Sequence, residues 1–307
     1  MKNIKPEKEL AILATPIVKM GRFSKGDIAT YYNHTLYQYK VGWQLNKSRG
    51  VHFGLWYDDT ENLHEAIINT NKKIGNVIGE SKGLKLLDAG CGVGGTAIFL
   101  AQNYNCHVEG ITLSSSQCKL ADKFIKELNL KDTVNVSIKD YTQTDFQDNS
   151  FDMVYAIESI CHAREKSDFY TEAYRLIKPG GKLVFMEYIK TSKGALAQNR
   201  SSLNWLLHRW AIEDIDNYNQ TVTKLKETGF ENIQTENLTS NVLKSVKIMW
   251  RRAMFGIITI PLYAILHPGK YQFSRRHPES GWALHKCFRK KLMEYWFFNA
   301  VKPDEEK

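Results

Sequence analysis

A glycine-rich segment contains the residues whose types and spacing have the clearest chemical meaning. The sequence LKLLDAGCGVGG, residues 84–95, is an apolar run that ends in Asp88 and leads into four glycines. In an open parallel sheet, ligands bind beyond the carboxyl ends of the strands. A glycine-rich first turn lets the ligand approach backbone amides and the N-terminus of the next helix. The spacing therefore predicts a loop that binds a cofactor.

The dinucleotide fingerprint G-x-G-x-x-G is the obvious alternative for this loop. Gly90, Gly92 and Gly95 satisfy it literally, but the pattern alone is weak evidence. Two details favour another cofactor. Asp88 stands immediately ahead of the glycines, and the second apolar run, HVEGIT, has no acidic residue at its end to hold an NAD ribose.

The elements that must position this loop follow from the pattern beyond it. From residue 84 onward, short apolar runs alternate with helix-length segments, which predicts βαβ units and a parallel sheet wound in both directions. A further helix over 217–228 ends at Gly229, and a strand follows. Ahead of this core lies an aromatic-rich helical region, and behind it a basic region with little strand character. We predict a helical lid over 1–80, a core over 81–240 and a C-terminal extension over 241–307.

The segment DAGCGVGG resembles the D/E-x-G-x-G-x-G signature of class I S-adenosylmethionine-dependent methyltransferases. The resemblance implies a Rossmann-like α/β fold with a doubly wound, mostly parallel seven-stranded sheet. It also implies S-adenosyl-L-methionine as cofactor and S-adenosyl-L-homocysteine as product. In that family the glycine backbone lies against the methionine part of the cofactor and the acidic residue supports the loop. The cofactor-binding residues implied here are Asp88, Gly90, Cys91, Gly92 and Gly94.

The second strand is expected to end in EGITLSSSQ, which departs from most of that family. An acidic residue usually stands where Thr112 is, and it holds the ribose hydroxyls. The branch that includes tocopherol, sterol and cyclopropane-fatty-acid methyltransferases commonly reads G-x-T-L-S-x-x-Q, as residues 110–117 do. This resemblance implies that Thr112, a backbone group near Leu113 and the Gln117 amide contact the cofactor. Ser114 is also typical of a helix N-cap.

Three further residues are implied to line the cofactor. Asp140 and Tyr141 follow the third strand, where the family places residues around the adenine, and Ile157 is at the end of the fourth. A carboxylate at Asp140 can accept a hydrogen bond from the adenine amino group. An aspartate at a strand end is equally a common turn residue.

The segment after the fourth strand, YAIESICHA at 155–163, resembles the YAIEATCHAP signature of sterol C-methyltransferases. Methyl transfer from a sulfonium needs mostly positioning and exclusion of water. When a carbon–carbon double bond is the acceptor, a carbocation forms, and Glu158 and His162 supply a negative charge and a base. For a phenol or amine acceptor, His162 is the base instead. Alternatively, His162 shapes the loop by bonding a backbone carbonyl.

The upstream sequence YYNHTLYQYKVGWQLNKSRGVHFGLW is dense in aromatic residues. It resembles the YEYGWG…FHF signature of sterol methyltransferases, although YKVGW fits only with a gap. Aromatic faces stabilise a sulfonium or carbocation by about 0.5–2 kcal/mol per ring. We therefore expect Tyr39, Trp43 and His52 to bind the acceptor, while plain core packing is the alternative.

The charge is concentrated at the C-terminal end. Residues 240–307 hold 13 of the 42 Lys and Arg residues but 5 of the 33 Asp and Glu residues, so most of the net charge of +9 lies there. Within it, residues 247–270 are apolar and interrupted by Pro261, too short and broken to span a bilayer. The region 247–291 therefore walls an acceptor pocket, makes peripheral contact with a membrane, or is an ordinary buried helix.

Other classes of protein fit less well. The pI of about 9.1 suggests RNA methylation, but no RNA-binding module and no NPPY-type motif are visible, so we expect no nucleic acid. The five cysteines form no CxxC pair, so neither a metal site nor a disulfide framework is expected. The N-terminus does not resemble a signal peptide, which favours a cytoplasmic protein, peripherally membrane-associated if the basic region binds lipid. The oligomeric state is left open.

Together these patterns favour transfer of a methyl group from S-adenosylmethionine to a small lipophilic acceptor, with a sterol or other isoprenoid carbon first. Methylation of oxygen or nitrogen on a tocopherol-like or other natural-product acceptor is one alternative, and a cyclopropane-fatty-acid type of reaction is another. A non-catalytic lipid- or nucleotide-binding protein on the same fold is the alternative from a different class.

Overall fold

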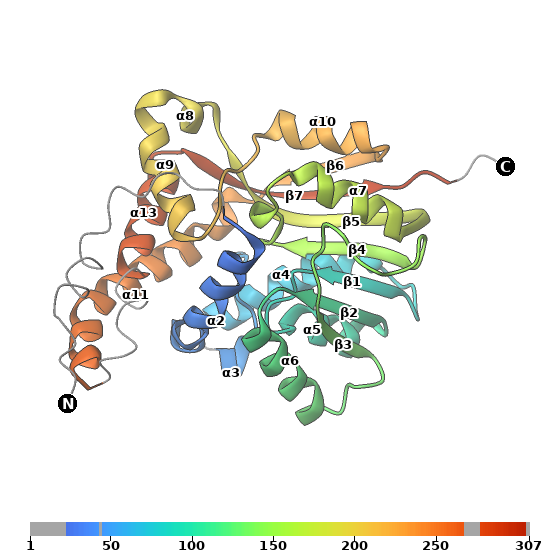
Figure 1. The fold of residues 1–307 in the computed structure, drawn as a ribbon, viewed down its shortest axis with the longest axis horizontal. Coiled ribbons are helices and arrows are strands. Elements are labelled where there is room, and N and C mark those ends of the chain that lie inside the picture. The colour runs from blue at the N-terminus through green and yellow to red at the C-terminus, as the bar shows by residue number, and fades with distance from the viewer. Residues whose placement is uncertain (1–22, 43–44, 267–276, 305–307) are drawn as a thin grey trace, which may run out of the picture.

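The computed structural model describes residues 23–42, 45–266 and 277–304, and it describes no side chains for 37–42, 256–266, 277 and 278. The predicted fold class is confirmed: a seven-stranded sheet has the order β3-β2-β1-β4-β5-β7-β6 (Figure 1). All neighbouring strands are parallel except where β7 pairs with β5 and β6. The strands are β1 (Lys85–Ala89), β2 (His107–Thr112), β3 (Val134–Ile138), β4 (Phe151–Ile157), β5 (Ile177–Lys190), β6 (Glu231–Asn237) and β7 (Met293–Val301).

Alternating side chains of the strands build a core on each face of the sheet. On β1, Leu86 belongs to one hydrophobic cluster and Leu87 to the other, and Tyr155 and Val154 divide in the same way on β4. This follows from the two-residue period of a strand, whose successive side chains point to opposite faces. The helices of the core are α4 (Leu63–Ile78), α5 (Gly95–Tyr104), α6 (Ser115–Glu127), α7 (Lys166–Leu176) and α10 (Tyr218–Thr228).

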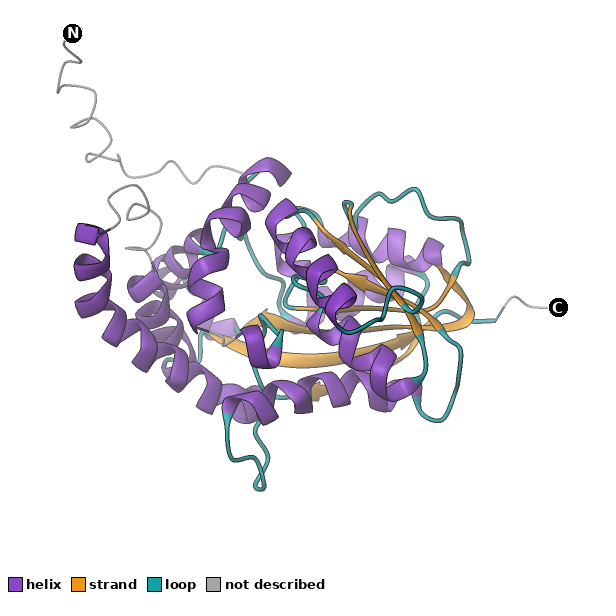
Figure 2. Ribbon diagram, turned by 90° about the horizontal axis from the view of Figure 1, so that it is seen from below, coloured by secondary structure: helices purple, strands orange, loops and turns teal. Residues whose placement is uncertain are grey.

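Additional helices gather at one end of the molecule (Figures 1 and 2). In Figure 1, α2 lies beside α6, whereas α9, α11 and α13 lie together at the left. α11 continues through Pro261, where we predicted an interruption. No helix in the described ranges is long and apolar enough to cross a membrane. The remaining helices are α2 (Lys25–Gly42), α3 (Leu45–Ser48), η1 (Ile160–His162), α8 (Ser192–Ala195), α9 (Ala197–Arg209), α11 (Thr239–Leu266) and α13 (His277–Arg289).

The C-terminal region contradicts the prediction of little strand character. β7, MEYWFFNAV, lies between β5 and β6, so the last strand of the sheet comes from the region we assigned to an extension. Its alternate residues are mostly buried, and it pairs with both neighbours along its length. The division at residues 80 and 240 remains a prediction, but the core sheet includes 293–301. The predicted helix stop at Gly229 is confirmed, with φ +104°.

Candidate functional site

The glycine loop joins β1 to α5 through residues that adopt left-handed backbone angles. Gly90 has φ +92°, Gly92 +56° and Gly94 +77°. A side chain at Gly90 would also collide with its neighbour, because an added Cβ would lie 2.4 Å from the Cβ of Ser159. Ser159 in turn donates a hydrogen bond from its hydroxyl to the Ala89 carbonyl at 2.5 Å. The loop therefore depends on glycine for its conformation and for this close approach.

Buried polar contacts support this loop from beneath. Asp88 is 4% exposed and accepts a hydrogen bond from the Tyr155 hydroxyl at 2.9 Å. Burial raises the pKa of Asp88 to about 7, against the effect of that hydrogen bond. The backbone amides of Gly90 and Cys91 both donate to the Ile111 carbonyl, at 3.0 and 2.9 Å. The Cys91 side chain is buried, so it packs the loop onto β2.

The end of β2 directs Gln117 towards the glycine loop. The Thr112 hydroxyl donates to Gln117 Oε1 at 2.9 Å, and the Ser114 hydroxyl accepts from the Gln117 amide at 3.2 Å, which confirms Ser114 as the N-cap of α6. The Gln117 Nε2 lies 3.9 Å from where a Cβ on Gly92 would stand. Thr112 thus orients Gln117 by its hydroxyl, and Leu113 between them is half-buried.

Asp140 lies after β3 and is held on both sides. Its Oδ1 accepts hydrogen bonds from the amide and hydroxyl of Thr142, at 2.9 and 2.8 Å, and its other oxygen pairs with Lys25 of α2. Burial works to raise the pKa of Asp140, but the bonds from Lys25 and Thr142 outweigh it and lower the pKa. The neighbouring Tyr141 hydroxyl donates to the Ser159 carbonyl at 2.6 Å, and Ile157 ends β4 half-buried.

Glu158 is the charged centre of the acceptor side. Its Oε1 accepts from the Phe53 amide at 2.6 Å and from the Tyr295 hydroxyl at 2.9 Å, and its Oε2 accepts from the Tyr188 hydroxyl. Its backbone is left-handed, with φ +52°. Burial raises its pKa to about 7, although the three hydrogen bonds oppose this. A carboxylate with this pKa gains and loses a proton near neutral pH.

The donors to Glu158 also enclose it in aromatic rings. The ring centroids of Phe53, Tyr188 and Tyr295 lie 5.7–5.8 Å from one another, and Trp210 lies 5.5 Å from Tyr188. Tyr188 and Tyr295 were missed as site residues. The available signal was a tyrosine with apolar residues beside it in each of two strands, β5 and β7.

His162 follows Glu158 in the loop 158–165, which we call the acceptor loop. Its Nδ1 lies 3.3 Å from the Ala211 carbonyl, which only accepts, so the proton is on Nδ1 and Nε2 accepts from the Tyr32 hydroxyl at 2.7 Å. Burial lowers the pKa of His162 to about 4. The imidazole is therefore neutral at pH 7, and the interpretation that it bonds a backbone carbonyl is confirmed.

Of the three predicted acceptor-binding residues, the structure describes the side chain of His52 alone. Trp43 lies outside the described residues, and Tyr39 lies in α2 where side chains are not described. His52 is 6% exposed, with Nδ1 3.0 Å from the Phe53 carbonyl and Nε2 3.5 Å from the Thr96 hydroxyl. Burial lowers its pKa. These contacts pack His52 against Phe53 and Thr96, and its contact with an acceptor stays a prediction.

The helix α2 contacts three of the predicted site regions. Beyond Lys25 at Asp140 and Tyr32 at His162, its Asn33 accepts from the Ser114 hydroxyl at 2.7 Å and the Ser116 amide at 3.1 Å. Closer to the glycine loop, a Cβ on Gly95 would lie 2.0 Å from the Arg49 carbonyl. The N-terminal region therefore covers the carboxyl ends of β2, β3 and β4.

This sheet order, with a glycine loop after β1 and polar residues beyond the strands' carboxyl ends, defines the class I methyltransferase fold. The structure of the [4+2]-cyclase SpnF superposes with a TM-score of 0.74 at 22% identity, covering 92% of this chain and 98% of that one. Geranyl diphosphate C-methyltransferase from Streptomyces coelicolor A3(2) gives 0.70 at 16% identity, covering 94% and 100%. Because one neighbour is a cyclase, the fold leaves the chemistry to the site.

The sequence comparison then identifies the family. The family model described as mycolic acid cyclopropane synthetase matches residues 32–256, so the chain belongs to this family. The Saccharomyces cerevisiae sterol 24-C-methyltransferase is 31% identical over 69% of this chain and 55% of its own length. The Arabidopsis thaliana 24-methylenesterol C-methyltransferase 2 is 30% identical over 75% and 62%. The chain thus spans between half and two thirds of these curated relatives.

Proposed function

We propose that this protein transfers a methyl group from S-adenosyl-L-methionine to a carbon atom of a small lipophilic acceptor, a sterol or other isoprenoid. The observation that carries the proposal is the Glu158 carboxylate, held by two tyrosine hydroxyls and the Phe53 amide within an aromatic enclosure. The sterol C-methyltransferase names of the relatives support the choice of acceptor.

The residues at the carboxyl ends of β1 to β3 fit the cofactor. Three of the five residues from Gly90 to Gly94 are glycines, and the side chains of the other two, Cys91 and Val93, are buried, so the backbone of this loop is open to a ligand. The side-chain amide of Gln117 faces the loop. We assign the methionine part to this backbone, the ribose and adenine to Leu113 and Gln117, and the adenine amino group to Asp140. When bound, the cofactor supplies an electrophilic methyl group on sulfur.

The acceptor side fits a reaction that passes through a positive charge on carbon. When the π electrons of an acceptor double bond form the new carbon–methyl bond, the sulfur–methyl bond breaks and leaves its electron pair on sulfur, and the other alkene carbon becomes cationic. The Glu158 carboxylate and the faces of Phe53, Tyr188 and Tyr295 stabilise that charge. Loss of a proton from a neighbouring carbon restores a double bond, and Glu158 is the base that receives it.

Methylation of oxygen or nitrogen is the second candidate, and the Tyr32–His162 hydrogen bond favours it. His162 is neutral, and its Nε2 already accepts a hydrogen bond from the Tyr32 hydroxyl, 2.7 Å away, as it would from a phenol, alcohol or amine acceptor that took the place of Tyr32. In that reaction His162 takes the proton from the oxygen or nitrogen that is methylated, and Glu158 does not act as a base.

Peripheral contact with a membrane is also part of the proposal. Trp205 on α9 and Trp282 on α13 are 38% and 47% exposed, and their rings meet edge to face with centroids 6.3 Å apart. Arg209 lies 4.2 Å over the first ring and Lys286 4.8 Å over the second. Exposed tryptophans beside cations suit the headgroup region of an anionic bilayer, where a lipophilic acceptor dissolves.

The experiment that tests the function is calorimetric titration with S-adenosylmethionine and S-adenosylhomocysteine, followed by mass spectrometry of sterols, isoprenoids and phenols incubated with enzyme and cofactor. We expect binding, and a gain of one methyl mass on an isoprenoid carbon. A methylated phenol or amine instead would select the second candidate. Absence of cofactor binding would contradict both.

A further inference from the structure

A buried lysine lies beneath the acceptor loop. Lys166 is the first residue of α7, and it is only 6% exposed. Its ammonium donates to three backbone carbonyls, those of Cys161 at 3.2 Å, Ala163 at 2.8 Å and Asp214 at 2.7 Å. Because an ammonium carries three protons, these bonds use all of its donors.

The three carbonyls join two segments of the chain. Two of them are in the acceptor loop, whereas Asp214 lies in the connection between α9 and α10. The same connection supplies the Ala211 carbonyl, 3.3 Å from His162 Nδ1. Lys166 therefore ties the loop that carries Glu158 and His162 to the segment that orients the His162 ring.

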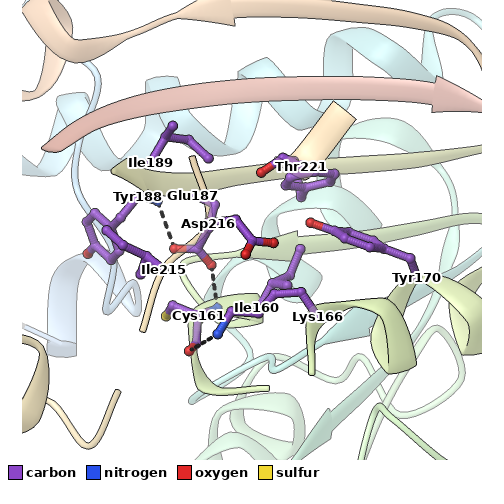
Figure 3. A pocket seen from close by; sticks show the side chains of 11 residues that line it. Ile160, Cys161, Lys166, Tyr170, Glu187, Tyr188, Ile189, Ile215, Asp216 and Thr221 are labelled. Carbon is purple, nitrogen blue, oxygen red and sulfur yellow. Dashed lines mark hydrogen bonds between the residues drawn. The ribbon is translucent and has the colours of Figure 1, made fainter. Parts of the chain in front are cut away.

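Glu187 on β5 holds the same loop through a backbone amide, whereas Lys166 holds it through backbone carbonyls. Its Oε2 accepts from the Cys161 amide at 2.9 Å, and its Oε1 from the amide of Tyr188 at 2.8 Å, whose hydroxyl bonds Glu158. Figure 3 shows the Lys166 ammonium and the Glu187 carboxylate both directed at Cys161, beside a small cavity that they line. One residue of the acceptor loop is thus held at its amide by a carboxylate and at its carbonyl by an ammonium.

A buried ammonium at this position costs stability, so we ask what it contributes that an apolar side chain does not. Burial lowers the pKa of Lys166, and nearby acidic groups only partly offset this. An apolar side chain of the same length would avoid the cost of burying a charge, but it would leave the three carbonyls without a donor. The titratable groups that act on the ammonium are Cys161, Glu187, Asp214 and Asp216. Those near the His162 ring are Lys166 and, from α2, Tyr32.

We propose that Lys166 is a positioning residue for the methyl transfer assigned above: it fixes the acceptor loop against the α9–α10 connection, and so sets the orientation of Glu158 and His162. This rests on the proposed function for its effect on turnover. A second consequence is electrostatic and does not rest on it. The Lys166 ammonium bonds the carbonyls of Cys161 and Ala163, the residues on either side of His162, so its positive charge disfavours a proton on the His162 ring, in addition to the larger effect of burial.

The test compares Lys166→Met with a matched control at the other end of the sheet. Lys302 donates to Asn149 Oδ1 at 2.7 Å and to the carbonyls of Tyr174 and Ile177, both at 2.9 Å. Both substitutions therefore remove an ammonium that binds three oxygens. We expect Lys166→Met to lower kcat roughly 10- to 100-fold through misplacement of the loop. Lys302→Met loses stability but keeps the wild-type kcat. Equal losses of kcat in the two variants would overturn the proposal.

A titration of His162 by NMR, with S-adenosylhomocysteine and no acceptor, gives a readout that loss of stability does not change. We expect the His162 pKa to rise in Lys166→Met and to stay unchanged in Lys302→Met.

Lys166→Arg keeps the charge but not the contacts with three carbonyls, so kcat falls while the His162 pKa stays low. This variant carries the test if Lys166→Met does not fold. Full kcat in Lys166→Arg, or an unmoved His162 pKa in Lys166→Met, contradicts the proposal. If the wild type methylates no acceptor, the proposed function fails, but the His162 titration still tests Lys166.

Discussion

The protonation state of Glu158 is the central question at the scale of single residues. Burial raises its pKa to about 7, so the carboxyl is protonated in a large share of molecules at neutral pH. Only the carboxylate stabilises a cation and accepts a proton. The left-handed backbone of this residue and its three donors hold the group in one orientation, because each donor comes from a different part of the chain.

We therefore expect kcat/KM to rise with pH through about 7 and then to level off, as Glu158 loses its proton. Glu158→Gln is expected to lower kcat by about 10²- to 10⁴-fold, the usual range for a general base, and to abolish the rise. The measurement is a pH–rate profile between pH 5.5 and 9 at saturating cofactor.

Asp88 provides the control for this profile, because burial raises its pKa to about 7 as well. Asp88→Asn should weaken cofactor binding but retain the rise of kcat/KM with pH. If Asp88→Asn flattens the profile and Glu158→Gln does not, the base has been assigned to the wrong carboxyl.

At the scale of elements, polar side chains of α2 bond residues of the predicted cofactor site. Asn33 bonds the first turn of α6, where Ser114 and Gln117 lie, and Lys25 bonds Asp140. These contacts hold α2 against the first turn of α6 and against Asp140.

Asn33→Ala removes the acceptor of the Ser114 hydroxyl and the Ser116 amide. We expect a loss of about 1 kcal/mol, which is typical of a helix-capping contact, and hence roughly fivefold to tenfold weaker binding of S-adenosylhomocysteine by calorimetry. Asn62→Ala is the matched control, because Asn62 caps α4 by accepting from the Glu65 amide at 3.1 Å. It should lower stability and leave cofactor affinity unchanged. Equal affinities for both variants would argue against a role of α2 in binding.

At the scale of the whole molecule, the exposed Trp205 and Trp282 lie on α9 and α13, two of the helices gathered at one end of the molecule (Figure 1). α13 packs against both α9 and α11, so Trp205 and Trp282 come together although they are far apart in sequence. The acceptor loop lies at the carboxyl end of β4, and the connection from α9 reaches it at Ala211.

The double variant Trp205→Ala/Trp282→Ala is expected to lose most binding to vesicles of phosphatidylcholine and phosphatidylserine in a flotation assay. Binding of the wild type should fall between low and high salt, since the cations contribute about 1 kcal/mol each near an anionic surface. Tyr57→Ala removes an aromatic side chain of similar exposure, 43%, outside these helices, and should float like the wild type. A wild-type protein that never floats contradicts the membrane contact.

Local sequence patterns were enough to predict the alternation of strands and helices, the glycine loop, the Ser114 cap and the stop at Gly229. Each of these depends on interactions within a few residues, namely backbone angles, caps and side-chain periodicity, and such interactions are visible in a short segment. The family resemblance of residues 155–163 also points to Glu158 and His162 from the sequence alone, although their roles remain predictions.

Only the folded chain brings the partners of these residues together. Glu158 is bonded by residues 105, 30 and 137 positions away, and the place of β7 between β5 and β6 supplies one of them, Tyr295. Tyr32 and His162 are 130 positions apart, and Lys166 reaches Asp214 48 positions on. Contacts at these separations depend on how whole elements pack, which the pattern of any one segment does not contain. For that reason the acidic centre was predictable, whereas the tyrosines, the neutral imidazole and the buried ammonium around it were not.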